Sequence, residues 1–127
     1  MAESDLLKVH IDRDGGKDGG PSHAGVLDVP ADATVGELLR IVRIKNLLAG
    51  TEPERTTWLV DCGGKGCIGV MTRQWREPKL LIAADTRLSD LFAGAEPRLT
   101  FRHWGLADPR RVFECLRAGE KLPERYL

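Results

Sequence analysis

A chain of 127 residues is long enough to bury one hydrophobic core and leaves little room for a second domain. Hydrophobic residues make up 42% and charged residues 30%, a balance typical of a globular domain and not of a disordered chain. The 19 basic and 19 acidic residues cancel, which argues against a nucleic-acid binder, because neutralising phosphates needs a net positive surface.

The N-terminus, the hydropathy and the cysteines indicate the compartment. No apolar run approaches the ~20 residues that a membrane-spanning helix needs. The first residues, Met1-Ala2-Glu3-Ser4-Asp5, are acidic, unlike the basic start of a signal peptide. Three cysteines, an odd number, suit a reducing compartment better than a disulfide framework. We therefore expect a soluble, cytoplasmic protein with no membrane partner.

The start of the chain predicts a β-hairpin. Leu7, Val9 and Ile11 alternate with polar residues, as in a half-buried strand. The polar, glycine-rich residues 14–22 form the loop, and residues 24–29 form the returning strand.

A helix is predicted to follow this hairpin. Thr34 and Glu37 have the spacing of a capping box, in which each side chain satisfies a backbone amide of the other residue. Gly50 is a natural stop, and Arg40 and Arg43 fall largely outside the apolar stripe. That stripe consists of Val35, Leu38, Leu39, Val42 and Leu47 or Leu48.

The second half of the chain predicts further strands and two short helical segments. The strands cover residues 57–60, 68–72, 79–83 and 98–104. The glycine-rich residues 63–66 form a tight turn between the first two. A helical turn covers residues 85–92, and the tail from residue 108 onward can form a short helix through Val112, Phe113 and Leu116.

Two short motifs, together with this order of elements, carry a family resemblance. The first is residues 26–39, VLDVPADATVGELL, a second strand that runs directly into the helix. The second is residues 85–91, DTRLSDL, just before the strand that begins at residue 98. In both, the chain resembles the ubiquitin-like β-grasp family, over about residues 6–104.

The resemblance implies an α+β fold of the β-grasp type. It predicts a mixed sheet of four to five strands packed on one main helix, with an extra hairpin between residues 58 and 79. We accordingly expect a β-grasp domain over residues 1–105 and a C-terminal extension over residues 106–127.

This fold hosts many unrelated roles, so the function has to be argued from particular residues. No catalytic motif converges in the sequence, which favours a non-catalytic protein–protein interaction module or adaptor in a multi-protein, bacterial-type system. Conjugating and sulfur-carrying members of the family end in Gly-Gly, whereas the last predicted strand here ends at His103-Trp104-Gly105. A protein modifier processed after Gly105 is therefore an alternative and not the main expectation.

Cys62 and Cys67 suggest a second alternative, a small redox or metal-binding protein of degenerate ferredoxin-like type. Their C-x₄-C spacing, with glycines inside, is similar to the start of a plant-type [2Fe–2S] loop, which also lies on a β-grasp fold. The third thiolate should fall where Val70 stands, and Cys115 is the one other cysteine. Three sulfurs cannot supply the standard ligation, so we expect no iron–sulfur cofactor.

Zinc and a thiol pair are the other chemistries that the cysteines allow. Zinc-binding cysteine pairs are typically separated by two to four residues, and the pair here, Cys62 and Cys67, is a C-x₄-C and not a C-x₂-C. The available ligands are Cys62, Cys67 and Cys115 with His10, His23 or His103. We expect no bound metal, and we interpret Cys62 and Cys67 as residues that flank a turn, close enough to be a candidate redox pair.

The expected partner is a protein, and tryptophan–arginine pairs mark where it binds, because these residues are enriched in binding hot spots. Trp75-Arg76 and Arg102-His103-Trp104 are such pairs. Charge favours the second pair. Residues 1–37 hold three basic and eight acidic residues, a net −5, whereas residues 98–127 hold seven basic and four acidic residues, a net +3. The predicted partner-binding residues are Arg102, Trp104, Arg110 and Arg111.

Overall fold

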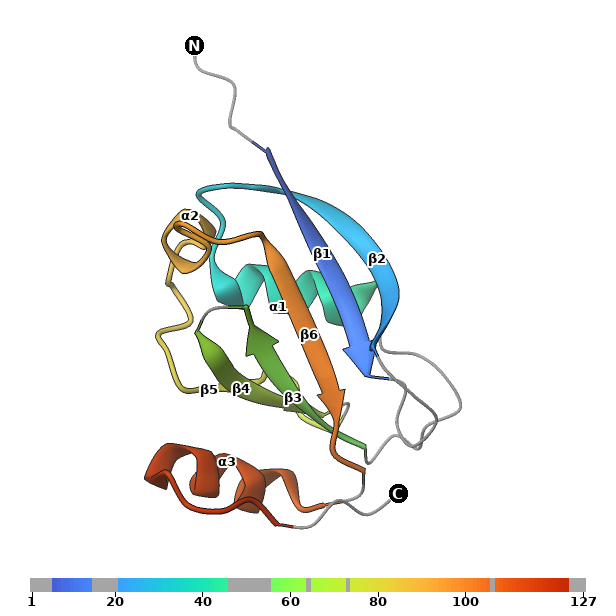
Figure 1. Cartoon of the computed structure of the whole chain (residues 1–127), viewed down its shortest axis with the longest axis vertical. Coiled ribbons are helices and arrows are strands. Elements are labelled where there is room, and N and C mark those ends of the chain that lie inside the picture. Colours follow the sequence, from blue (N-terminus) through green and yellow to red (C-terminus); the bar gives the residue numbers. More distant parts are fainter. Residues whose placement is uncertain are drawn as a thin grey trace.

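The computed structural model describes residues 6–14, 21–45, 56–63, 65–72, 74–105 and 107–123. These ranges contain six strands and three helices (Figure 1). The strands are β1 (Leu6–Asp14), β2 (Pro21–Pro30), β3 (Thr57–Cys62), β4 (Gly66–Thr72), β5 (Lys79–Leu80) and β6 (Arg98–His103). The helices are α1 (Val35–Ile44), α2 (Leu88–Leu91) and α3 (Pro109–Ala118).

The strands form one open, mixed sheet in the order β2-β1-β6-β3-β4-β5. β1 pairs with β6 in parallel, and every other neighbouring pair is antiparallel. The first and last strands of the chain therefore lie side by side inside the sheet (Figure 1). The predicted α+β class is confirmed at this level, with α1 packed across one face.

The sheet contains six strands within the described residues, one for each of the six predicted strand segments, whereas the family resemblance implied four to five strands and an extra hairpin. The short strand β5 covers only two residues, not residues 79–83, and it pairs with Gly69 and Val70 of β4. Gly69 allows this pairing, since a Cβ atom there would lie 2.7 Å from Cδ2 of Leu80 and 2.7 Å from the carbonyl oxygen of Lys79. Because any larger residue would clash, the edge of the sheet depends on this glycine.

The predicted start of α1 is confirmed. Thr34 Oγ1 accepts a hydrogen bond of 3.2 Å from the Glu37 amide, and Glu37 Oε1 accepts one of 3.3 Å from the Thr34 amide. The helix ends at Ile44 with Lys45 as its C-cap, earlier than the predicted stop at Gly50. Leu47, Leu48 and Gly50 lie outside the described residues.

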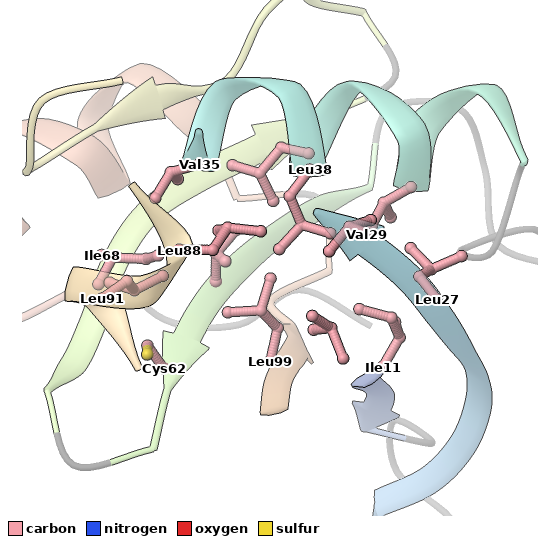
Figure 2. Close-up of a cluster of buried hydrophobic side chains, with 14 of the residues drawn as sticks. Ile11, Leu27, Val29, Val35, Leu38, Cys62, Ile68, Leu88, Leu91 and Leu99 are labelled. Carbon is pink, nitrogen blue, oxygen red and sulfur yellow. The ribbon is translucent and has the colours of Figure 1, made fainter. Parts of the chain in front are cut away.

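The main core lies between α1 and one face of the sheet. Figure 2 shows Val35 and Leu38 of α1 pointing toward side chains of the strands, among them Ile11 of β1 and Leu99 of β6. All four side chains are fully buried. Leu88 and Leu91 of α2 extend this core at one end, so burial of apolar area holds the two helices on the same face.

A second, smaller core lies on the opposite face, beneath α3. Leu59 of β3 and Val70 of β4 face each other across the strand pair and pack with Ala107 and Val112. The helix above them begins at the N-cap Asp108, whose carboxylate accepts a hydrogen bond from the Arg110 amide. It ends at Gly119 with a φ of 72°, a left-handed conformation that favours glycine. No helix among the described residues is long and apolar enough to cross a membrane.

Candidate functional site

A groove of about 530 Å³ runs along α1, between that helix and residues 74–80, which follow β4 and include the short strand β5. We call it the α1 groove. Leu39 and Val42 of α1 line it, together with Trp58 of β3 and Met71 of β4, and all four of these side chains are buried. The groove therefore has an apolar floor made from the same side chains that form the core.

The rim of the α1 groove is charged and exposed. Arg40 and Arg43 lie on α1 outside its buried stripe, so their side chains stand at the edge of the floor. The Arg43 guanidinium donates a hydrogen bond to the carbonyl oxygen of Arg76, and an Arg40 nitrogen lies 3.8 Å from a carboxylate oxygen of Glu77. These contacts join the helix to the facing segment.

The two ends of the α1 groove differ in charge. At the C-terminal end of α1, the three arginines Arg40, Arg43 and Arg76 stand beside one acidic residue, Glu77. A smaller hollow adjoins this end and reaches Ile44, whose side chain is 74% exposed although it is large and apolar.

At the N-terminal end of α1, the charged residues of the groove are acidic. Glu37 and Asp85 line this end and are both exposed. One carboxylate oxygen of Glu37 is already engaged by Thr34 in the capping box. The groove is therefore electrically polar along the helix axis, basic at one end and acidic at the other.

Trp75 belongs to both the groove and the second core. Its half-buried ring lines the α1 groove and also packs against the cluster beneath α3. The Lys79 ammonium lies 5.6 Å from the centre of the Trp75 ring and 5.8 Å from that of Phe113 on α3. Cation–π attraction of this kind links the wall of the groove to α3.

The structure engages Arg102 and Trp104 in contacts within the fold. Arg102 Nε lies 2.7 Å from Oδ2 of Asp61, and its guanidinium carbon is 5.7 Å from the centre of the Trp104 ring. The half-buried Trp104 packs against the second core, and its indole donates a hydrogen bond to Pro123. Arg110 and Arg111 are exposed on the first turn of α3.

Asp61 lies between this arginine and a thiol, on the α3 face of the sheet. Burial raises the pKa of the Asp61 carboxyl, although the Arg102 guanidinium and a hydrogen bond from Cys67 both act to lower it. Desolvation thus outweighs the ion pair, and the charged form of Asp61 is disfavoured relative to the same carboxyl in water.

Cys62 and Cys67, the candidate redox pair, lie on opposite faces of the sheet. Cys62 pairs with Gly66 and Cys67 pairs with Asp61, after a register shift between Val60 and Asp61. Neighbouring residues of a strand point to opposite faces, so Cys62 packs in the main core and Cys67 against the second core. Both thiols are free. The register shift therefore puts the two cysteine side chains on opposite faces, because Cys62 would lie directly opposite Cys67 without it.

The environment of the two thiols does not favour reactivity. Burial raises the pKa of Cys62, and it raises that of Cys67, where the Asp61 carboxylate adds to the effect. A raised pKa lowers the fraction of thiolate, which is the nucleophile and the metal ligand.

The residues considered for zinc do not meet at one place. Cys115 is buried on α3, whereas the buried His103 ring stands edge-on to Trp58 of β3, with the two ring centres 5.1 Å apart. The side chain of His23 lies outside the described part of the chain. Within the described ranges, no group of three or more His, Cys, Asp or Glu side chains is placed to hold a metal ion.

Trp75 and Arg76, the tryptophan–arginine pair that charge disfavours in the sequence, lie on one wall of the α1 groove. The other wall carries Arg40 and Arg43, which the sequence predicts only as the polar side of a helix. Their spacing of three residues, which puts both on one edge of α1, is the signal that marks them as a pair.

The chain matches no protein-family model, and no curated protein matches it in sequence.

Proposed function

We propose that the chain is a ubiquitin-like β-grasp domain that binds another protein through the α1 groove, as a non-catalytic adaptor in a multi-protein system. Three features support the fold assignment. The first and last strands are parallel neighbours, α1 follows the first hairpin and packs on the sheet, and the short α2 comes just before the last strand.

The observation that carries the binding proposal is the pairing of an apolar floor with an arginine rim. Buried Trp58 and Met71 form the floor, and exposed Arg43 and Arg76 stand at the edge. Binding hot spots commonly combine a pocket for an apolar anchor with arginines around it. The exposed Ile44 next to these arginines extends the apolar contact area beyond the groove.

The described contacts give less support to the other two functions. The pKa values of Cys62 and Cys67 are raised and their side chains lie on opposite faces, which disfavours redox chemistry between them. For a modifier processed after Gly105, cleavage would remove α3 and uncover Leu59 and Val70 on the sheet. Such exposure of buried apolar side chains is costly.

Affinity capture with matched charge variants tests this proposal. The protein is immobilised as wild type, as Arg43→Glu with Arg76→Glu, and as Lys65→Glu with Lys121→Glu. The last pair makes the same change of charge at exposed positions that do not line the groove. We expect a protein from the source cell to be retained by the wild type and the lysine variant and lost from the arginine variant. Equal retention by all three would contradict binding through the groove.

A further inference from the structure

We infer that the segment which occupies the α1 groove carries bulky apolar side chains next to a cluster of acidic residues, with its acidic end over Arg43 and Arg76. The inference rests on the proposed function and adds to it the chemistry of the partner and the direction in which the partner lies.

The partner segment needs apolar side chains because the α1 groove has an apolar lining. The buried side chains of Leu39, Val42 and Trp58 close the floor, and the apolar surface open to a partner comes from Met71 and from the half-buried Trp75, Pro78 and Leu80. A volume of about 530 Å³ falls within the range of ~300–1,000 Å³ in which pockets enclose most of a ligand. Two or three side chains of a short segment can therefore be buried there, as in groove-binding peptides.

The acidic requirement follows from a surplus of positive charge. At the C-terminal end of α1, Arg40 is paired with Glu77. Among the described residues, no carboxylate lies within ion-pair distance of Arg43 or Arg76. The bond from Arg43 to the Arg76 carbonyl uses one of the five N–H donors of its guanidinium. Two arginines beside an apolar floor thus have donors left for the carboxylates of a partner.

The direction in which the partner segment lies follows from the charges at the N-terminal end of the α1 groove. Glu37 and Asp85 give the N-terminal end of the groove a negative charge, which would repel an acidic segment laid the other way. The occupant is therefore acidic over the C-terminal end of α1 and neutral or basic over its N-terminal end. Because both charged ends are exposed, they affect the association rate and the orientation more than the total affinity.

Peptide display supplies a probe without knowledge of the natural partner. A phage library of random peptides of about 12 residues is selected on the wild-type protein and depleted on the Ala84→Trp variant. Ala84 is exposed at the edge of the groove, so a tryptophan there obstructs the groove without replacing a buried residue. We expect the enriched peptides to share one or two bulky apolar residues followed or preceded by Asp or Glu.

The enriched peptides are then synthesised with a fluorophore, and their affinities are measured by fluorescence polarisation. Binding should weaken about tenfold with Arg43→Glu and Arg76→Glu and change less than about twofold with Lys65→Glu and Lys121→Glu. Peptides in which Lys replaces the acidic residues should regain affinity for the double arginine variant. Arg76→Glu is also measured alone. Arg43 bonds to the backbone carbonyl of residue 76 and not to its side chain, so this variant keeps that hydrogen bond and leaves α1 unchanged.

The outcomes separate the two proposals. Peptides that lose binding with Ala84→Trp but carry no acidic residues, or do not respond to the arginine changes, would overturn the partner chemistry and leave the groove as the site. Selection of no peptide, or of peptides that bind Ala84→Trp equally well, would overturn the groove itself. A wild-type dimer in analytical ultracentrifugation that is lost with Arg76→Glu would identify a second copy as the occupant and overturn the inference.

Discussion

The indole nitrogen of Trp104 donates a hydrogen bond of 2.9 Å to the carbonyl oxygen of Pro123. Trp104 directly follows β6, so this bond joins the central region of the sheet to the chain beyond α3. Its ring packs on the second core with Leu122, while the Arg102 guanidinium lies over it. The contacts of Trp104 are those of a residue that holds the C-terminal region against the sheet.

Replacement of Trp104 is therefore expected to lower stability. Trp104→Ala removes a half-buried ring and should reduce the free energy of unfolding by about 2 kcal/mol. Trp104→Phe keeps most of the ring and loses the hydrogen bond, at a cost of about 1 kcal/mol. Urea denaturation measures both. If neither variant differed from the wild type, the second core would not depend on Trp104, and its role as a partner contact would become the better explanation.

Substitution of Gly69 tests how closely β5 packs against β4 at the edge of the sheet. Because a Cβ atom at this position would lie 2.7 Å from atoms of Lys79 and Leu80, Gly69→Ala should cost about 1–3 kcal/mol through overpacking. Gly63→Ala is the matched control, since a Cβ atom there meets nothing within 4 Å. We expect the control to change stability by less than about 0.5 kcal/mol. Equal effects of the two alanines in urea denaturation would show that β5 does not approach β4 as closely as described.

The capping box of α1 makes a further prediction about stability. Thr34→Ala should cost about 1 kcal/mol, because the Glu37 amide loses its acceptor, whereas Thr34→Ser should cost much less. Thermal or urea denaturation of the two variants gives the comparison. A serine variant as unstable as the alanine variant would point to the lost methyl group and not to the cap.

Asp61 predicts a dependence of stability on pH. Its pKa is raised above the ordinary value of 3.8, mainly by burial, so the folded protein holds the proton to higher pH than the unfolded chain does. Stability contributed by the protonated form is therefore complete below the unfolded pKa and is lost as the pH rises through the folded pKa. Asparagine does not titrate, so Asp61→Asn lacks this contribution to the pH dependence of stability.

Urea denaturation of the wild type and Asp61→Asn at acidic and neutral pH tests this sign. The variant should gain stability relative to the wild type as the pH rises from about 3 to 7. A relative loss over the same interval would mean that the ion pair with Arg102 outweighs desolvation, and that Asp61 stabilises the fold in its charged form.

Local interactions explain which parts of the structure were predictable. Thr34 and Glu37 lie three residues apart and bond to each other, so the start of α1 can be read from the sequence. Alternation likewise placed Val9 and Ile11 on one buried face. These signals need no knowledge of the rest of the chain.

The parts that could not be predicted depend on contacts between distant segments. The register shift between Val60 and Asp61 decides which face of the sheet each cysteine occupies. The residue pattern of the hairpin does not predict this shift. The α1 groove arises only when residues 74–80 pack across from the helix, which brings Arg76 to Arg43 over 33 positions of sequence. The need for glycine at position 69 likewise arises from its contact with Leu80, which the sequence alone does not predict.

Site-specific photocrosslinking tests the central claim that a partner protein occupies the α1 groove. Benzoylphenylalanine replaces Ile44, an exposed apolar residue beside the basic end of the groove, or Ala118, an exposed residue on α3. Each variant is irradiated in the source cells. We expect a discrete covalent adduct with one protein from position 44, lost when Arg43→Glu and Arg76→Glu are added, and none from position 118. An adduct from position 118 together with none from position 44 would contradict the account and place the binding surface on α3.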